Sequence, residues 1–279
     1  MTEYIIITLK APQINFDLLT ALLLDIGCDS FSEEPNQLIA YIEESVFDQN
    51  KLKNILQTIK EQSIHLEYQV AKLENKNWNA EWENNFEPVK VKNECIVRAS
   101  FHPIDKQYTY DIIINPKMSF GTGHHETTHM MLEHLLDIEV ENKIVMDAGA
   151  GTGILSILAS MKKAKAVTAF DIEDWAYNNA IENIKLNNCN QITVLQGTIN
   201  TLNLPFNKYD IILANINKNV LLEEISVYYK FLNHRGILIL SGFFENDISD
   251  LNTVAQASNL LLEKTNVKNN WSSIIYKKN

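Results

Sequence analysis

The chain has 279 residues, 46% of them hydrophobic, and a formal net charge of −11. This composition supports a substantial core in one large domain or two, and the negative charge makes a nucleic acid phosphate backbone a poor default ligand. Three widely spaced cysteines exclude a disulfide framework and a zinc knuckle, and they favour a reducing compartment. There is no positively charged signal peptide and no apolar run of roughly 18 residues, so we expect a cytoplasmic protein without a membrane partner.

Residues 1–72 are predicted to form a small α+β domain. Strand-like alternation and apolar stripes at helical spacing predict strand 4–9, helix 17–25, strands 30–34 and 38–43, helix 48–61 and strand 65–70. This β-α-β-β-α-β order is ferredoxin-like, with two helices on one face of an antiparallel sheet. Eleven acids against five lysines make the surface either a solvated acidic face or a docking face for a basic protein.

Residues 73–88 are rich in Asn and Glu but contain Trp78, Trp82 and Phe86 at intervals of four. That spacing favours a short amphipathic helix, so we expect a structured linker.

From residue 89 the chain alternates strands and helices. Segments 89–97 and 109–114 are β-rich, a helix is expected near 127–136, and strands are expected at 143–147, 166–172, 191–196, 209–216 and 236–241, with a helix at about 220–232. We expect three strand–helix units after the strand at 143–147. Nearly continuous apolar strands indicate a parallel sheet covered on both faces, and a hairpin over 260–267 and 272–277 closes it. The fold class is therefore α/β, a Rossmann-like doubly wound sheet with an antiparallel end.

A literal H-E-x-x-H motif, His125-Glu-Thr-Thr-His129, lies before the first long strand. On a helix it could hold zinc, with Glu126 as the base of a hydrolase. Gly121-Thr-Gly123 places His125 at the helix entrance, however, and His134 is poorly spaced for a third ligand. The zinc hydrolase stays a minor alternative, and we assign no metal site.

A glycine-rich turn, Asp147-Ala-Gly-Ala-Gly-Thr-Gly153, separates a predicted strand from a predicted helix. Such turns bring backbone N–H groups against a nucleotide-like ligand. The glycines, including Gly149 and Gly151, do not follow the dinucleotide spacing G-x-G-x-x-G, and an acid, Asp147, leads into the turn. This variant resembles the S-adenosylmethionine (SAM) loop of class I methyltransferases.

Two polar residues end neighbouring predicted strands. Asp171 lies 22 residues after Gly149, where a carboxylate can accept hydrogen bonds from ribose hydroxyls; its alternative role is to cap the next helix. Asn215 ends the next strand but one, where it should face the methionine end of the cofactor and the methyl acceptor. Its amide can accept from an amine and donate elsewhere, although Asn is also common in turns.

The segment Asn115-Pro-Lys-Met-Ser-Phe-Gly-Thr-Gly-His-His-Glu-Thr-Thr128 resembles the pre-loop of the ribosomal protein L11 methyltransferase (PrmA) family, usually P-G-x-A-F-G-T-G-T-H-P-T-T. The glycine turn, Asp171, Asn215-Ile-Asn217 and Leu240-Ser-Gly242 follow in the family's order. The departures from the family pattern are Lys117, Ser119, His124, Glu126, Ala150, Lys218 and Asn219.

The resemblance implies a SAM-dependent enzyme that methylates lysine side-chain and/or N-terminal amines of ribosomal protein L11. It implies a substrate-recognition domain at 1–72, a linker at 73–88 and a catalytic domain at 89–279. By the motif match, the cofactor-binding residues are Thr128, Asp147, Gly149, Gly151, Asp171 and Asn215, with Asn215 also orienting the acceptor, and the pre-loop residues over SAM are Phe120, Gly121, Thr122, Gly123 and His125.

Two further alternatives stay open at this stage. An enzyme of the same fold could act on a small molecule or on RNA, but the acidic charge disfavours RNA and the extra amino-terminal domain favours a protein. A non-catalytic ribosome-binding protein could retain the fold, but the intact glycine turn and Asp171 disfavour it. We expect L11, free or on the ribosome, as the partner, without sequence-specific nucleic acid binding.

Overall fold

The computed structural model describes residues 4–61, 66–72, 87–115, 119–206 and 208–279. The chain divides into two compact units, residues 1–82 and 83–279. This boundary falls inside the segment 73–88 that we interpreted as a linker. The helix expected around Trp78, Trp82 and Phe86 lies outside the described residues.

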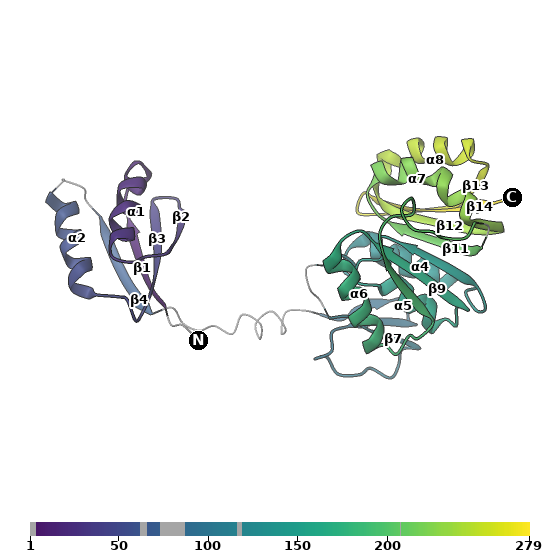
Figure 1. Ribbon diagram of the computed structural model, residues 1–279, viewed down its shortest axis with the longest axis horizontal. Helices are drawn as coiled ribbons and strands as arrows, with labels where there is room; N and C mark the ends of the chain where they lie inside the picture. Colours follow the sequence, from purple (N-terminus) through teal and green to yellow (C-terminus); the bar gives the residue numbers. More distant parts are fainter. Residues whose placement is uncertain (1–3, 62–65, 73–86, 116–118, 207) are drawn as a thin grey trace. The chain divides into compact units, whose positions relative to one another are not determined.

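The amino-terminal unit is an antiparallel sheet covered by two helices, as its hydrophobic pattern predicts (Figure 1). In β1, alternate residues point inward, so Ile5, Ile7 and Leu9 pack against Leu19 and Leu23 of the first helix. The strand order is β2-β3-β1-β4. The elements are β1 (Tyr4–Lys10), η1 (Gln13–Asn15), α1 (Phe16–Asp25), β2 (Ser30–Glu34), β3 (Gln37–Glu43), α2 (Gln49–Glu61) and β4 (Glu67–Lys72).

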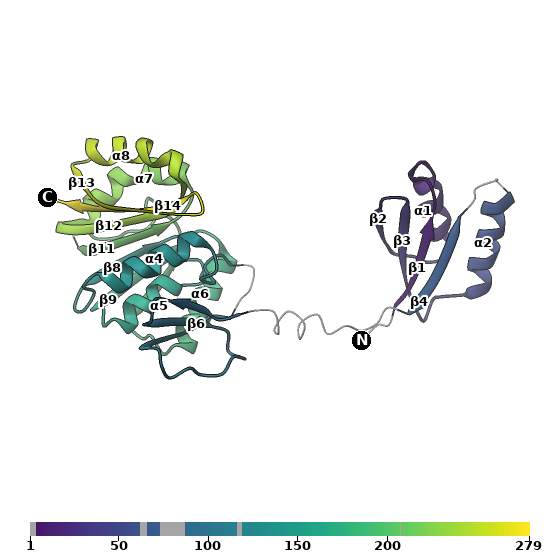
Figure 2. The same ribbon diagram turned by 180° about the vertical axis from the view of Figure 1, so that it is seen from behind.

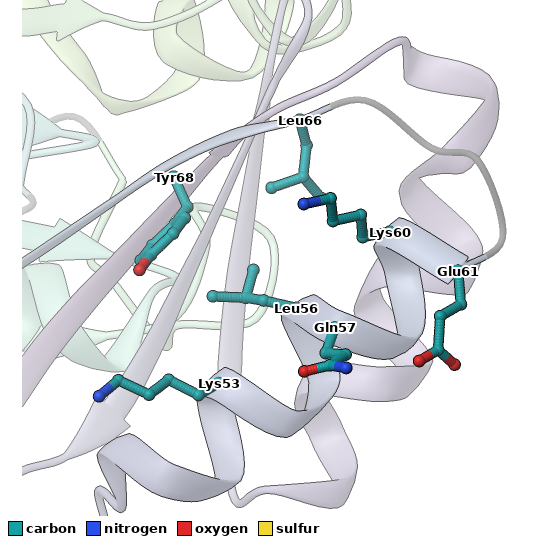
Figure 3. Close-up of a pocket in the computed structure, with 7 residues that line it drawn as sticks. All are labelled: Lys53, Leu56, Gln57, Lys60, Glu61, Leu66 and Tyr68. Carbon is teal, nitrogen blue, oxygen red and sulfur yellow. The ribbon is translucent and has the colours of Figure 1, made fainter.

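An open groove of about 820 Å³ lies between α2 and β4. Figure 3 shows Leu56 of α2 facing the space beside Leu66 and Tyr68, with Lys53 extending along the helix side of that space. All of β4 is exposed, because α2 buries only Leu52 and Ile59 against the sheet. None of the predicted catalytic or cofactor-binding residues belongs to this unit.

The carboxy-terminal unit contains the predicted doubly wound sheet. Its strand order is β10-β9-β8-β11-β12-β14-β13, with the first five strands parallel and β14 antiparallel to both of its neighbours. The predicted antiparallel end is therefore confirmed. The strands are β8 (Ile144–Ala148), β9 (Ala166–Asp171), β10 (Ile192–Gln196), β11 (Tyr209–Asn215), β12 (Leu232–Phe244), β13 (Leu260–Lys268) and β14 (Trp271–Lys278).

Helices cover both faces of this sheet, which explains the apolar strands (Figures 1 and 2). Successive strand residues enter opposite cores: Val145 packs on the side of the first three helices, and Met146 packs on the side of the last two. The first face carries α4 (Glu126–Asp137), α5 (Ile154–Met161) and α6 (Asp174–Leu186), and the second carries α7 (Lys218–Phe231), η2 (Glu245–Asp247) and α8 (Ile248–Ala257). A small sheet of β5 (Val89–Val91), β6 (Cys95–Arg98) and β7 (Tyr110–Ile113) packs outside α4 and α5.

One prediction about this unit was wrong. We expected a helix after each of three strands, but β10 is followed by turns and irregular backbone through the described residues up to 206. Thr201 accepts a hydrogen bond from the Thr198 N–H, and Pro205 lacks a donor for helical bonding, so local side-chain chemistry competes with a helix here. Among the described residues, no helix is long and apolar enough to cross a membrane.

Candidate active site

A cavity of about 350 Å³ opens at the carboxyl edge of the parallel strands. Parallel strands end at one edge of a sheet, so residues distant in sequence meet there. The cavity is lined by Phe120, Ala148, Gly149, Phe170, Asp171, Ile172, Gly197, Thr198, Asn215, Ile216, Asn217, Val220, Glu224 and Tyr228.

The glycine turn, residues 147–153, contributes Ala148 and Gly149 to the cavity wall. The N–H groups of Gly149 and Ala150 both donate to the Phe170 carbonyl, at 2.9 and 3.0 Å, which ties the turn to the end of β9. Gly149 has φ +70°, and a Cβ on it would lie 2.3 Å from Cγ2 of Ile216. A side chain at Gly149 would therefore collide with Ile216, the residue that follows β11.

The described end of the pre-loop, residues 119–128, packs directly on the glycine turn. The Thr152 N–H donates to the Phe120 carbonyl at 3.0 Å, and the Thr152 hydroxyl donates to the Gly121 carbonyl at 2.5 Å. Gly151 has φ +54°, and a Cβ there would lie 2.4 Å from the Phe120 oxygen. The contact between pre-loop and turn thus requires glycine at 151.

Asp171 lies at the end of β9, and its carboxylate accepts two backbone hydrogen bonds. One carboxylate oxygen accepts from the Gly151 N–H at 2.9 Å, and the other accepts from the Glu173 N–H at 3.1 Å. The carboxylate therefore links the glycine turn to the backbone just before α6, whose N-cap is Glu173. Asp171 also lines the cavity, and each oxygen keeps a lone pair for a ligand hydroxyl.

Asn215 lines the cavity, and its amide has an unused acceptor. Its amide nitrogen donates to the Thr128 hydroxyl at 3.3 Å, while its buried amide oxygen has no hydrogen-bond partner among the described residues. Thr128 itself is buried at the start of α4 and does not line the cavity. The two elements α4 and β11 therefore fix the amide and leave its oxygen available to a donor.

Asp147, the first residue of the glycine turn, is buried and does not line the cavity. Its carboxylate accepts from both the N–H and the hydroxyl of Ser156, at 3.1 and 2.6 Å, in the first turn of α5. Complete burial raises its pKa to about 6; the hydrogen bonds from Ser156 oppose this, and the charge of Asp171 adds to it. Asp147 therefore supports the turn from beneath.

The side chains of the H-E-x-x-H motif interact with three different residues and do not converge on one point. His125 is the N-cap of α4 and accepts from the Thr127 N–H, Glu126 accepts from Asn269, and His129 pairs with Glu133 at 3.4 Å. His134 is buried against the Ser273 hydroxyl. No group of three metal-ligating side chains occurs in the part of the chain that the structure describes.

Two residues that differ from the family pattern, Glu126 and Lys218, link elements around the site without lining the cavity. Glu126 binds Asn269 in the turn between β13 and β14, so it anchors the pre-loop to the end of the sheet. Lys218 pairs with Asp247 and Asp250, each at 2.7 Å, and so joins α7 to α8. Neither side chain lines the cavity.

An aromatic row that the sequence did not reveal extends from the cavity. Ring centroids lie 5.1 Å apart for Phe120 and His125, 4.7 Å for His125 and Trp271, and 4.1 Å for Trp271 and Phe244. Phe120 lines the cavity, and both Phe120 and Phe244 are half-exposed. The residues come from three separate elements, so no local pattern could have linked them.

Glu224 and Tyr228 were also missed. Both lie on the apolar face of α7 and line the cavity, although they are far in sequence from every motif used to find the site. The available signal was an acid within the apolar stripe of a helix, since Glu224 sits between Leu221 and Ile225.

These residues fit SAM. The cavity has the scale of a small-molecule site, an acid lies where a ribose would need acceptors, and the unpartnered oxygen of Asn215 suits an amine donor. The glycine turn offers close backbone approach without side chains. Phe120, Asp171, Gly149 and Asn215 would be the residues in contact with the cofactor.

Comparisons with known proteins agree with this geometry. The family described as "Ribosomal protein L11 methyltransferase (PrmA)" matches residues 18–279. Proteins named ribosomal protein L11 methyltransferase are similar to this chain: one from Bacteroides thetaiotaomicron is 40% identical over 92% of both chains, and one from Porphyromonas gingivalis is 41% identical over 93% of this chain and 89% of the relative. A crystal structure of ribosomal protein L11 methylase from Lactobacillus delbrueckii subsp. bulgaricus is 25% identical, with a TM-score of 0.63, and covers 70% of this chain and 100% of that one.

The contact between pre-loop and glycine turn can be tested with Gly151→Ala. The added Cβ collides with the Phe120 carbonyl and displaces the pre-loop. We therefore expect SAM affinity to fall by about tenfold or more, which is the free-energy equivalent of losing about one hydrogen bond. Isothermal titration calorimetry measures the change. Gly153→Ala is the control, because it has similar backbone strain (φ +79°) but its Cβ lies 3.4 Å from Ala180, away from the pre-loop. Equal losses in the two variants would contradict the role of this contact.

The raised pKa of Asp147 predicts a pH-dependent stability. Below about pH 4 the carboxyl is protonated in both states; as the pH rises, the unfolded chain loses this proton first, while the folded protein keeps it until about pH 6. Its contribution to the free energy of unfolding therefore falls between pH 4 and pH 6, by on the order of 3 kcal/mol. Asp147→Asn should remove this component. Urea unfolding gives the free energy of unfolding of wild type and variant at pH 4 and at pH 7, and the wild type should lose more stability than the variant between the two pH values. An equal change in the free energy of unfolding of wild type and variant between pH 4 and pH 7 would refute the raised pKa of Asp147.

Proposed function

The chain belongs to the ribosomal protein L11 methyltransferase family, and from this premise we propose that it transfers methyl groups from SAM to lysine side-chain and/or N-terminal amines of ribosomal protein L11. It is a SAM-dependent methyltransferase by family and fold. The observation that carries the proposal for an amine acceptor is the buried, unpartnered amide oxygen of Asn215 at the cavity.

The chain's residues would prepare the acceptor nitrogen for attack. Bound SAM supplies an electrophilic methyl group on its sulfonium. A lysine amine, with a pKa of about 10.4 in water, must reach the site neutral, and transfer from water into a closed cavity favours that form. The Asn215 oxygen accepts a hydrogen bond from the amine and so directs its lone pair, while the pre-loop excludes water.

The cofactor roles form part of the same proposal. Asp171 accepts from the ribose hydroxyls, and Gly149 and Gly151 allow backbone contact. Thr128 acts through its hydrogen bond with Asn215, and Asp147 acts through the start of α5. The pre-loop members are Phe120, Gly121, Thr122, Gly123 and His125, of which Phe120 reaches the cavity.

We assign recognition of L11 to residues 1–72 and catalysis to residues 89–279, with 73–88 as the linker. The acidic amino-terminal segment supports recognition of a basic protein. L11 would be bound free or on the ribosome, without sequence-specific contacts to nucleic acid, and the enzyme would act in the cytoplasm, where ribosomal proteins are found. The names of the relatives support L11 as the acceptor.

Methyl labelling tests this function directly. Incubation with SAM carrying a labelled methyl group and with purified ribosomal proteins should label L11, and mass spectrometry should place the label on lysine side chains or the N-terminal amine. Ribosomal RNA and a free amine substrate serve as parallel acceptors. Labelling of RNA or of a small molecule, with none on L11, would overturn the acceptor assignment.

Asn215→Ala tests the orienting role. Removing the amide oxygen should lower kcat about 10- to 100-fold, the effect of losing one aligned hydrogen bond, with a much smaller change in SAM affinity. Single-turnover kinetics with L11 separate the two quantities. Asn219→Ala, an exposed change in the first turn of α7, is the control and should behave as wild type. Wild-type turnover in Asn215→Ala would show that the side chain has another role.

A further inference from the structure

The edge strand β4 of the amino-terminal sheet has uncovered apolar side chains. Among the described residues, β4 ends the strand order and pairs with β1 alone. Tyr68 lies opposite Leu9 of β1, and the next pair on the same face joins Val70 to Ile7. Opposite residues of an antiparallel pair point to one face, which here is the face that the helices cover, the core side of the sheet. Leu9 and Ile7 are completely buried, but Tyr68 is 53% exposed and Val70 is 38% exposed, so the helices leave the core side of β4 open.

The charged residues of β4 leave the middle of this edge unprotected. Natural edge strands often carry a charged side chain that points to the core side and so blocks pairing with another chain. In β4 the charges are Glu67 and Lys72, at the two ends of the strand, and its middle contains Tyr68 and Val70. Within the described part of the chain, the outer edge of β4 is therefore available to a further strand.

The opposite wall of the groove is an apolar residue between two lysines. Leu56 of α2 faces the same space as Tyr68 of β4 (Figure 3). Lys53 and Lys60 lie about one helical turn to either side of Leu56, and both line the groove. Neither lysine forms an ion pair within the described residues. Glu61 also lines the groove, but Figure 3 shows its carboxylate pointing away from Tyr68.

The groove therefore differs in charge from the rest of its unit. Residues 1–72 carry eleven acids and five lysines, and three of the five lysines, Lys51, Lys53 and Lys60, lie on α2. A basic protein would suit the acidic remainder of the unit, whereas an acidic segment suits the groove. A second copy of this chain does not suit it, because two-fold pairing of β4 strands would make the two basic α2 helices face each other.

The spacing of the two lysines suits an extended segment. Seven residues of an α-helix advance about 10 Å, and four residues of a strand advance about 13 Å. Residues i, i+2 and i+4 of a strand project from one face. Acids at i and i+4 can thus reach Lys53 and Lys60 through their flexible side chains, while an apolar residue at i+2 contacts Leu56 and Tyr68.

We propose that the groove between α2 and β4 binds an extended acidic segment of another protein, which adds a strand to the free edge of β4. Two acids of the segment pair with Lys53 and Lys60, and the apolar residue between them covers Leu56 and Tyr68. The amino-terminal unit then has a second recognition surface, opposite in charge to the acidic one assigned to a basic acceptor. This contact is separate from methyl transfer and does not rest on the proposed function.

Two labelled peptides of opposite charge test the recognition. One contains Glu-Thr-Leu-Thr-Glu, and the other contains Lys-Thr-Leu-Thr-Lys. Fluorescence anisotropy would measure their affinities for the full chain as wild type, with Lys53→Glu and Lys60→Glu singly and together, and with Lys51→Glu. Lys51 is exposed on the same helix but does not line the groove, so Lys51→Glu is the matched control for each single variant.

The acidic peptide should bind wild type and Lys51→Glu with nearly equal affinity. Lys53→Glu and Lys60→Glu should each weaken this binding about threefold or more, because an attraction becomes a repulsion. The double variant should prefer the basic peptide. A variant that had lost its fold could not gain this reversed preference, so the reversal also shows that the groove is intact.

Hydrogen–deuterium exchange separates strand addition from attraction between charges alone. The acidic peptide at saturation should slow the exchange of backbone amides in residues 67–72 of wild type, because they become hydrogen-bonded or covered. Residues 30–34 form β2, the edge strand on the opposite side of the sheet, and should exchange as before. Unchanged exchange of residues 67–72 at saturation would overturn strand addition.

Three other results would overturn the proposal. Failure of the acidic peptide to bind, or equal binding of both peptides to wild type, excludes recognition by the lysines. An equal loss of affinity in Lys51→Glu and Lys53→Glu shows attraction to the helix as a whole. A wild-type dimer in sedimentation velocity that Tyr68→Ser abolishes assigns the edge of β4 to a second copy of the chain.

Discussion

The peptide N–H and hydroxyl of Thr152 tie the glycine turn to the carbonyls of Phe120 and Gly121, and the site depends on this contact. It joins two segments about 30 residues apart in sequence and sets the pre-loop against the cavity. The contact requires a backbone without a side chain at Gly151. The glycine turn therefore receives the pre-loop, and in the proposed cofactor site it would also offer its backbone to SAM.

The polar groups of the cavity are fixed before any ligand binds. Asp171 is held by two backbone N–H groups and Asn215 by Thr128, so each presents its remaining acceptor capacity in a set direction. Asp147 supports the same turn through Ser156. Such fixed acceptors suit a reaction in which the protein contributes mainly by positioning, since little reorganisation is needed when the amine arrives.

Much of the fold could be predicted because its signals are local. Apolar strand runs identified the parallel sheet, and the glycine spacing with Asp171 indicated a nucleoside site at its edge. The helix expected after β10 is absent, since turn chemistry at Thr198 and Thr201 outweighs the expected alternation. The aromatic row at Trp271 could not be anticipated, because only the sheet order brings β14 to this edge, whereas Glu224 had a local signal, an acid within the apolar stripe of α7.

The central claim is that the cavity holds SAM with its ribose at Asp171 and its reacting sulfur beside Asn215. A crystal structure of the protein with S-adenosylhomocysteine tests it most directly. We predict both ribose hydroxyls within hydrogen-bond distance of the Asp171 carboxylate and the sulfur on the side of Asn215 and Phe120. A nucleoside bound in the reverse direction, or outside the cavity, would contradict the account.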